Sequence, residues 1–281
     1  MREIEASEIT KTVSQLFQDA CHYLPKDVIE AIKKAQQEEE SPIGREVLES
    51  IIRNADISAK EQIPLCQDTG DAVVFLELGQ EVHIVGGDLY SAVNEGVRHG
   101  YTQGYLRKSM VSRPFSARVN TKDNTPAVIY TDIIPGDKLR IIAKPKGGGS
   151  ENMFRLAMLH PAKGRQGIID FVVSSVDKAG SNPCPPTIVG VGIGGTVEKT
   201  IMLAKRALLR KVGEPNTDTE TAELEREILG RINKLGIGPM GYGGRITALA
   251  VHIEIFPTHI ASLPVAVNLE CHSCRHKEAT L

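Results

Sequence analysis

The sequence contains no long apolar segment. No stretch approaches the roughly 18 consecutive apolar residues that a membrane-spanning helix requires. The first residues, MREIEASEITKTVSQLF, are charged and amphipathic, and they include no apolar signal core. From these two absences we predict a soluble cytoplasmic protein that makes no use of a membrane.

An excess of charge of one sign is also missing. The 281 residues include 33 Lys and Arg against 35 Asp and Glu, and basic residues form no block or aromatic-interleaved stripe. Nucleic-acid-binding proteins typically carry such a basic surface. We therefore expect no nucleic-acid partner.

Cysteine is scarce, and the number of cysteines is odd. The five are Cys21, Cys66, Cys184, Cys271 and Cys274. An odd number in a chain without an export signal argues against a disulfide framework. A chain of this length buries roughly three quarters of its unfolded surface, so a substantial hydrophobic core is available to it.

Hydrophobic periodicity predicts an α+β fold. We expect a helical N-terminal region over about residues 1–60, with helices at 5–22, 26–40 and 41–55. Further helices are predicted at 87–107, 153–160, 165–179, 196–212 and 217–235. Strands are predicted at 71–79, at 187–193, twice within 245–270, and as a hairpin within 127–145 that turns at Pro135 and Gly136. Because strands and helices do not alternate strictly, we expect mixed elements around one core in a single domain, residues 1–281.

Four of the cysteines lie in turn-like segments. Cys21 belongs to an amphipathic helix, and we predict that it is buried and inert. Cys66 lies in IPLCQDTG, Cys184 lies between prolines in SNPCPP, and Cys271 and Cys274 lie in NLECHSCRH. Thiolates that bind metal need fixed positions of this kind. The long sequence separations among Cys66, Cys184 and Cys271 exclude a local zinc ribbon or ferredoxin run as a site for all three.

Two local motifs allow functions of other classes. CHSCRH, residues 271–276, offers two Cys and two His for a zinc-stapled interaction module, although four ligands within six residues can hardly close one tetrahedron. GVGIGG, residues 190–195, lies between a predicted strand and a predicted helix, as in nucleotide-binding domains. No second strand ending in Asp or Glu follows about twenty residues later. We therefore favour a tight strand-to-helix turn at GVGIGG.

Seven motifs, in order along the chain, resemble one enzyme family. They are IPLCQDTG, YLRKSMV, NTPAVIYTDIIPGD, KPKGGGSEN, SNPCPP, GVGIGGT and FPTHIASLPVAVNLECHS. Together they are similar to the α subunits of class I iron-sulfur fumarate hydratases and the related L-tartrate dehydratases. In that family three cysteines hold a 4Fe-4S cluster whose fourth iron has no protein thiolate and serves as a Lewis acid. The resemblance implies that the ligands are Cys66, Cys184 and Cys271, with Cys274 close enough in sequence to replace Cys271.

The resemblance also implies two anion contacts. The guanidinium of Arg107, in YLRKS, has the planar shape that matches a carboxylate. The three glycines of KPKGGGSEN allow backbone N–H groups to converge, and Ser150 could cap a helix that begins at Glu151. In the family, the amide near Gly149 contacts the substrate carboxylate.

Polar side chains beside the ligands complete the predicted site. Gln67 can donate to a substrate oxygen, and Asp68 can orient a histidine or the reacting hydroxyl, so we predict a catalytic role for Asp68. The family places a substrate-contacting histidine at FPTHIAS, which predicts a substrate-binding or catalytic role for His259.

These features predict the α subunit of a two-subunit hydro-lyase that reversibly hydrates fumarate to L-malate. Dehydration of L-tartrate is the alternative, since both reactions use the same cluster and carboxylate contacts. The chain ends ten residues after Cys271, whereas single-chain family members continue into a domain that carries further arginines, a lysine and a threonine base. We therefore expect a β subunit to supply the carbon base in an α2β2-type assembly, and the α chain to be inactive alone.

Overall fold

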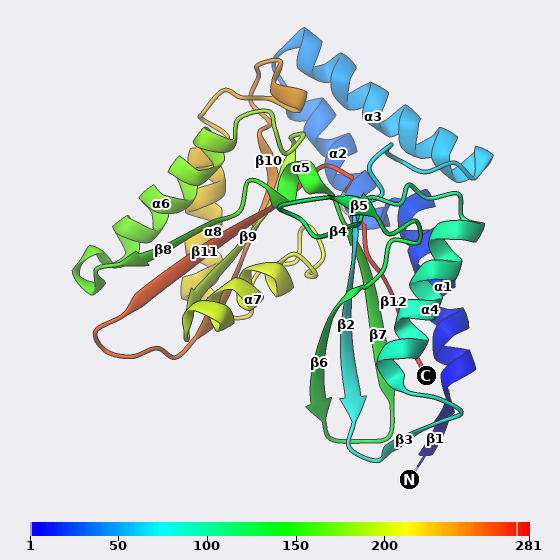
Figure 1. Ribbon diagram of the computed structural model, residues 1–281. Helices are drawn as coiled ribbons and strands as arrows, with labels where there is room; N and C mark the ends of the chain where they lie inside the picture. Colours follow the sequence, from blue (N-terminus) through cyan, green and yellow to red (C-terminus); the bar gives the residue numbers. More distant parts are fainter. Residues whose placement is uncertain (1, 274) are drawn as a thin grey trace. The chain divides into compact units, whose positions relative to one another are not determined.

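The computed structural model describes residues 2–273 and 275–281, which divide into two compact units (Figure 1). Unit 1 comprises the described residues of Met1–Leu24, Ala55–Gly148 and Arg275–Leu281. Unit 2 comprises the described residues of Pro25–Asn54 and Gly149–Cys274. Helices and strands are mixed in both units, which confirms the predicted α+β class. The prediction of a single domain stays a prediction.

The predicted N-terminal helices are present. They are α1 (Ala6–His22), α2 (Lys26–Glu38) and α3 (Pro42–Glu61). A short strand that the sequence did not predict, β1 (Arg2–Glu5), precedes them and pairs in parallel with β3 (Val82–Val85). Within the described part of the chain, no helix combines the length and the apolar character needed to cross a bilayer.

Unit 1 is built on a four-stranded sheet in the order β12, β7, β2, β6. The bounds of these strands are Lys277–Thr280, Leu139–Lys146, Asp71–Gly79 and Val128–Ile134. Helices α1 and α4 (Leu89–Gln103) lie side by side over one face of the sheet (Figure 1). Gly96 has no side chain and so lets the two helices approach closely. An added Cβ there would lie 2.6 Å from the Cβ of Val13. A short antiparallel pair, β4 (Val111–Ser112) and β5 (Val119–Asn120), also belongs to this unit.

The predicted hairpin within 127–145 is wrong. Both strands exist, but β2 lies between them, parallel to β6 and antiparallel to β7. The connection after β6 crosses the end of β2 and is held there by backbone bonds, including Gly79 N to Lys138 O at 2.9 Å. Gly79 permits this crossing, because a Cβ there would lie 2.4 Å from the Gly136 carbonyl oxygen.

Unit 2 is built on a second four-stranded sheet, in the order β10, β9, β11, β8. The bounds are Ala248–Phe256, Thr187–Gly194, Leu263–Glu270 and Arg155–Leu159. Helices α6 (Gly164–Ala179) and α8 (Thr219–Ile232) share a core with Val189, Val191 and Ile193 of β9. Helix α7 (Val197–Ala207) packs on the glycine face of β9. The one-turn helices α5 (Gly148–Glu151), η1 (Pro161–Lys163) and η2 (Pro239–Gly241) complete the described elements.

The helix predicted over 153–160 is wrong. These residues contain the strand β8, which pairs antiparallel with β11 from Leu159 opposite Leu263 to Arg155 opposite Val267. The open edge of β11 supplies backbone partners for this segment, and tertiary pairing of this kind overrides a weak local preference for helix.

The GVGIGG motif forms the strand-to-helix turn that we predicted. Gly194 and Gly195 have φ values of +89° and +74°, and α7 begins at Val197. A Cβ at Gly190 would lie 2.3 Å from the Ala204 carbonyl oxygen, and one at Gly192 would lie 2.1 Å from that of Thr200. The backbone of α7 therefore occupies the space that the glycines leave open.

Candidate functional site

Cys66 lies in unit 1, in the loop between α3 and β2. The preceding residue, Leu65, is buried, and its backbone N–H donates to the Cys21 carbonyl oxygen at the end of α1 (2.9 Å). The half-buried thiol lies 3.4 Å from Gln67 Oε1, and the Asp68 N–H points at the sulfur from 3.4 Å. The loop therefore presents sulfur, amide and carboxylate together.

Asp68 uses both carboxylate oxygens to fix the backbone around it. Oδ1 accepts from Gly70 N at 2.9 Å, and Oδ2 accepts from Gly148 N at 2.8 Å. Gly70 has a φ of +75°, and a Cβ there would lie 2.6 Å from the Lys146 backbone. Asp68 thus joins the Cys66 loop to the start of the glycine-rich segment.

Arg107 is positioned next to the same loop. The Thr69 hydroxyl donates to the Arg107 carbonyl oxygen at 2.9 Å, while the Arg107 side chain is exposed. Two residues that the sequence analysis missed hold the other side of the loop, because Tyr101 Oη and Asn124 Nδ2 donate to the Gly70 carbonyl oxygen at 3.0 and 3.1 Å. Asn124 is fully buried, and its position within the NTPAVIY motif was the available signal.

Cys184 lies in unit 2, before β9, and has a strained backbone. Its φ of +54° lies in the left-handed region that non-glycine residues rarely adopt. Its N–H donates to the Ser181 carbonyl oxygen at 3.0 Å, which closes the SNPCPP turn. Gly149 lies against this turn, since a Cβ there would lie 3.2 Å from the Asn182 carbonyl oxygen. Such strain concentrates at functional sites, where the surrounding structure holds it in place.

Cys271 follows β11 and is tied to the Cys184 segment through its neighbour. The N–H and Nδ1 of His272 lie 3.3 and 2.9 Å from the Cys184 carbonyl oxygen. Because a carbonyl can only accept, Nδ1 of His272 carries the hydrogen. Unit 2 therefore brings two predicted ligands to the same end of one sheet. Cys274, the alternative to Cys271, lies outside the described residues.

The glycine-rich segment differs from its prediction. Helix α5 begins at Gly148 and includes Ser150, so Ser150 does not cap a helix that begins at Glu151. The Glu151 carboxylate instead pairs with Lys205 of α7 and accepts from Asn268 Nδ2 of β11 at 3.1 Å. These contacts hold the residues next to Gly149 against the elements of unit 2.

His259 lies far from the cysteines of its own unit. It belongs to the exposed loop between β10 and β11, at the end of the sheet where β9 finishes (Figure 1). Cys271 follows Glu270, which pairs with Ile188 at the other end of β9. Six residues of strand at roughly 3.3 Å each separate the two ends by roughly 20 Å. The structure thus does not bring His259 together with Cys184 and Cys271.

The tautomer of His259 is nevertheless defined. Its Nδ1 accepts from the Ala261 N–H at 3.1 Å, so a neutral ring carries its hydrogen on Nε2. The imidazole therefore presents an N–H donor on its free side.

The four described cysteines form no disulfide with one another. Cys21 is fully buried in α1, as predicted, and burial raises the pKa of its thiol to about 11. Cys66, Cys184 and Cys271 are half-buried. Within either unit, no three His, Cys, Asp or Glu side chains of the described residues gather closely enough to hold a metal ion.

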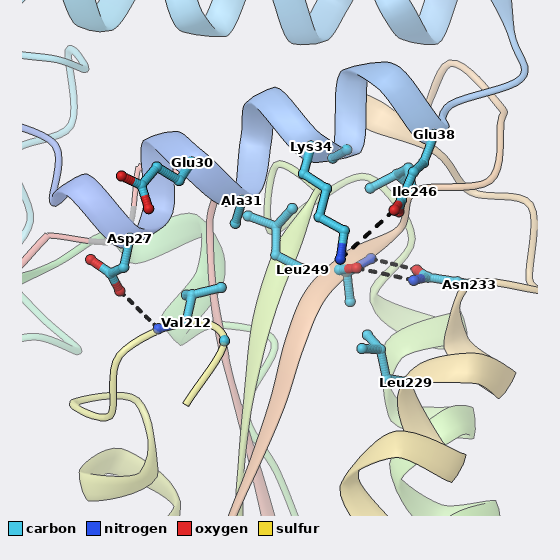
Figure 2. A pocket seen from close by; sticks show the side chains of 13 residues that line it. Asp27, Glu30, Ala31, Lys34, Glu38, Val212, Leu229, Asn233, Ile246 and Leu249 are labelled. Carbon is cyan, nitrogen blue, oxygen red and sulfur yellow. Dashed lines mark hydrogen bonds and ion pairs between the residues drawn. The ribbon is translucent and has the colours of Figure 1, made fainter. Parts of the chain in front are cut away.

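Figure 2 shows a pocket of about 370 Å³ in unit 2, beneath α2 and beside α8 and the start of β10. Three of its polar side chains have partners of their own. Asp27 accepts from Val212 N at 2.8 Å, Lys34 pairs with Glu38 at 3.8 Å, and Asn233 bonds the backbone of β10. None of the predicted site residues lines this pocket. We therefore do not assign the predicted chemistry to it.

Comparison with known proteins gives consistent results. The family described as "Fumarate hydratase (Fumerase)" matches residues 10–280. A protein of Methanocaldococcus jannaschii, provisionally named L(+)-tartrate dehydratase subunit alpha, is 44% identical over 275 residues, which cover 95% of each chain. The L(+)-tartrate dehydratase subunit alpha of Escherichia coli K12 is 31% identical over 280 residues, 98% of this chain and 90% of that one. The subunit of the same name from Shigella sonnei matches equally well.

Proposed function

The chain belongs to the fumarate hydratase family of iron-sulfur hydro-lyases, as an α subunit, and from this premise we propose that it is the α subunit of an L(+)-tartrate dehydratase. The observation that carries the proposal is the similarity over nearly the whole chain to subunits with that name. This choice reverses the order of our two sequence-based hypotheses, which placed fumarate first.

The cysteines fit the cluster that the family uses. Three half-buried thiols, Cys66, Cys184 and Cys271, lie in loops whose backbones are fixed by hydrogen bonds or strain. Thiolates are the usual ligands of iron-sulfur clusters, and a third thiolate without a fourth leaves one iron open. These residues would hold a 4Fe-4S cluster, which when bound supplies a Lewis acid to the departing hydroxyl.

Residues next to the ligands are suited to hold the substrate. The exposed guanidinium of Arg107 can bind one carboxylate bidentately. The backbone at Gly149 carries no side chain that would obstruct an approaching carboxylate. The amide of Gln67 lies beside the Cys66 sulfur, with Oε1 3.4 Å from it, and its Nε2 hydrogens can donate to a substrate oxygen.

Asp68 can act while it holds the loop. Each carboxylate oxygen keeps a second lone pair after accepting one backbone N–H. We propose that Asp68 orients the reacting hydroxyl in this way. Because His259 lies roughly 20 Å from Cys184 and Cys271 of its own chain, we propose that its Nε2 hydrogen contacts substrate bound at a neighbouring copy in the assembly. The carbon-bound proton must also be removed, and we assign its base to a β subunit, consistent with the name "subunit alpha" of the relatives. We propose an α2β2-type assembly.

The substrate test compares three dicarboxylates with one preparation. The α chain is co-expressed with its β subunit, purified without oxygen, and assayed with L-tartrate, fumarate and L-malate. Loss of water from L-tartrate gives an enol that becomes a 2-oxo dicarboxylate, which is detectable by its ultraviolet absorbance. We expect kcat/KM for L-tartrate to exceed that for the other two at least about tenfold, a difference of about 1.4 kcal/mol in transition-state binding. Turnover of fumarate without turnover of L-tartrate would reverse this assignment.

Fumarate hydration is the second candidate, because the description of the matching family names that reaction. The subunit proposal is tested with the same three substrates and a second preparation that lacks the β subunit. The α chain alone, with its cluster reconstituted, should show no turnover of any of the three substrates.

The ligand assignment predicts the behaviour of four serine variants. Cys66→Ser, Cys184→Ser and Cys271→Ser should each lose most of the bound iron and all activity, since a neutral hydroxyl is a poor iron ligand. Cys21→Ser is the matched control and should keep both, because Cys21 is buried in α1. Iron is counted per chain after anaerobic reconstitution. Full iron in Cys271→Ser with iron loss in Cys274→Ser would move the third ligand to Cys274.

A further inference from the structure

Arg275 is among the largest fully buried side chains of the described residues, with 1% of its surface exposed. It lies in unit 1, two residues before the start of β12, and its Nη2 donates to the Asp68 carbonyl oxygen at 2.7 Å. Arginine is rarely buried to this degree, because removing a guanidinium from water is costly unless acceptors and negative charge surround it. The residue therefore needs an explanation beyond packing.

Arg275 contacts the loop that carries Cys66 directly. Arg275, Cys66 and Asp68 are near enough to Cys21 to act on its thiol electrostatically, and the positive charge of Arg275 opposes the rise in the pKa of that thiol. The guanidinium donates to the residue that stands two positions after Cys66. Asp68 in turn holds Gly70 and Gly148. One buried cation is thus bonded to the backbone of the turn that carries the first predicted ligand.

The charge of this turn changes when Cys66 becomes a ligand. A thiolate replaces a thiol, and an anionic cluster lies beside it, within a part of the protein where the low dielectric strengthens electrostatic interactions. A guanidinium cannot lose its proton in a protein, so its charge is available at every working pH. A permanent positive charge close by stabilises the negative charge of the thiolate and the cluster.

We propose that Arg275 is a positioning residue for the iron-sulfur site, which fixes the Cys66 turn through the Asp68 carbonyl and balances the negative charge of the bound thiolate and cluster. This inference rests on the proposed function. It assigns a role to a residue of the CHSCRH segment that is neither a thiol nor an imidazole.

The test uses the complete α chain co-expressed with its β subunit. Arg275→Gln removes the charge but keeps hydrogen-bond donors, whereas Arg275→Lys keeps the charge. Arg210→Gln is the matched control, because Arg210 is a largely buried arginine of unit 2 that pairs with Glu225. Four quantities are measured for each variant: iron per chain, the rate of iron loss in air, the reduction potential of the cluster, and the melting temperature of the iron-free protein.

We expect Arg275→Gln to lose iron in air at least about threefold faster than wild type, and to have a more negative reduction potential, since a nearby positive charge favours the reduced cluster. Arg275→Lys should have a reduction potential closer to that of wild type than to that of Arg275→Gln. Arg210→Gln should lower the melting temperature and leave the potential unchanged.

The outcomes separate this inference from the function that it rests on. If wild type binds iron and Arg275→Gln has the same potential and the same rate of iron loss, the role of Arg275 is refuted while the proposed function stands. The role of Arg275 is also refuted if Arg275→Gln and Arg210→Gln lose iron equally fast, melt at equal temperatures and leave the reduction potential unchanged. A general loss of stability would then be enough to explain the loss of iron. If wild type itself binds no iron, the proposed function fails.

Discussion

His252 is a histidine that the fold keeps neutral. It lies in β10 with 2% of its surface exposed, and its Nδ1 lies 3.2 Å from the Ala207 carbonyl oxygen. Burial lowers the pKa of this ring to about 4, and the nearby Arg210 guanidinium adds to the lowering. In an unfolded chain the pKa of a histidine is about 6.5. Between these two values the unfolded chain binds a proton that the folded chain does not.

The protein should therefore lose stability as the pH falls from about 6.5 toward about 4, by up to about 3 kcal/mol from this group alone. Above pH 6.5 both states are neutral at His252, and no contribution from it is expected. His252→Asn retains a donor near the Ala207 carbonyl but cannot titrate, so the acid decline should become shallower by about that amount. Urea unfolding at several pH values from 4 to 7 measures the difference. An exposed histidine of β3, changed as His83→Asn, is the control, and an unchanged slope in His252→Asn would contradict the assignment.

At the residue scale, the sequence predicts candidate ligands and substrate contacts more readily than the residues that support them. The motifs identify the three cysteines and Arg107 as candidates, because these residues lie in short sequence patterns that resemble those of a known family. The residues that hold the loops in place are harder to predict, because the Asp68 carboxylate binds two backbone N–H groups and the Arg275 guanidinium binds one backbone carbonyl. Those partners are set by the path of the folded chain. Sequence spacing alone could not predict them.

The contact between β9 and α7 shows how glycines position an element. Gly190 and Gly192 face α7, and the backbone oxygens of Ala204 and Thr200 occupy the positions that side chains would need. Because those atoms are backbone, they cannot move aside without displacing the helix. The strand that begins just after Cys184 is thereby held against α7.

Gly192→Ala should destabilise the protein by about 3 kcal/mol or more, since overpacking against backbone is costly. The matched change Gly230→Ala adds the same methyl group to the exposed side of α8, where nothing lies within 4 Å. There we expect a gain of about 0.5–1 kcal/mol, because alanine restricts the unfolded chain and favours helix. Urea denaturation of both variants gives the comparison. Equal effects would show that the close packing at Gly192 is relaxed at little cost.

At the element scale, long periodic segments were predicted well and pairing was not. The strands β2, β9, β10 and β11 and the main helices appear where their patterns predict them. The hairpin failed because β2 inserts between β6 and β7. The helix at 153–160 failed because β11 offers an edge to residues whose own pattern is ambiguous. Both errors come from partners that are distant in sequence.

The position of the β10–β11 loop leads to a separate prediction for His259. Because this histidine lies roughly 20 Å along the sheet from Cys184 and Cys271, His259→Ala should leave the iron content of the α chain unchanged. Iron analysis and the visible absorption spectrum of the reconstituted protein check this. Reduced iron would mean that the loop supports the ligands in a way that the fold does not suggest. Full iron together with lost turnover would support the proposal that His259 contacts substrate bound at a neighbouring copy and does not hold the cluster of its own chain.

At the scale of the whole molecule, the path of the chain argues for cooperative folding. The chain passes between the two units after residues 24, 54, 148 and 274. One passage falls inside the continuous helix α3, and another falls inside α5. Neither unit is therefore a contiguous segment that could be excised and folded alone. If one unit unfolds, the segments of the other unit are no longer held together by folded chain at these passages.

We accordingly predict that the iron-free chain unfolds in a single transition, as one domain of 281 residues. Average values for globular proteins give an unfolding enthalpy of about 200 kcal/mol near 60 °C for this length, and the calorimetric and van't Hoff enthalpies should agree. Independent units would instead give van't Hoff enthalpies of about half that size. Gly192→Ala provides the sharper test, because its strain lies entirely within unit 2. A cooperative molecule shifts its whole transition to lower temperature in this variant. A second transition that stays at the wild-type temperature would show that the two units unfold separately.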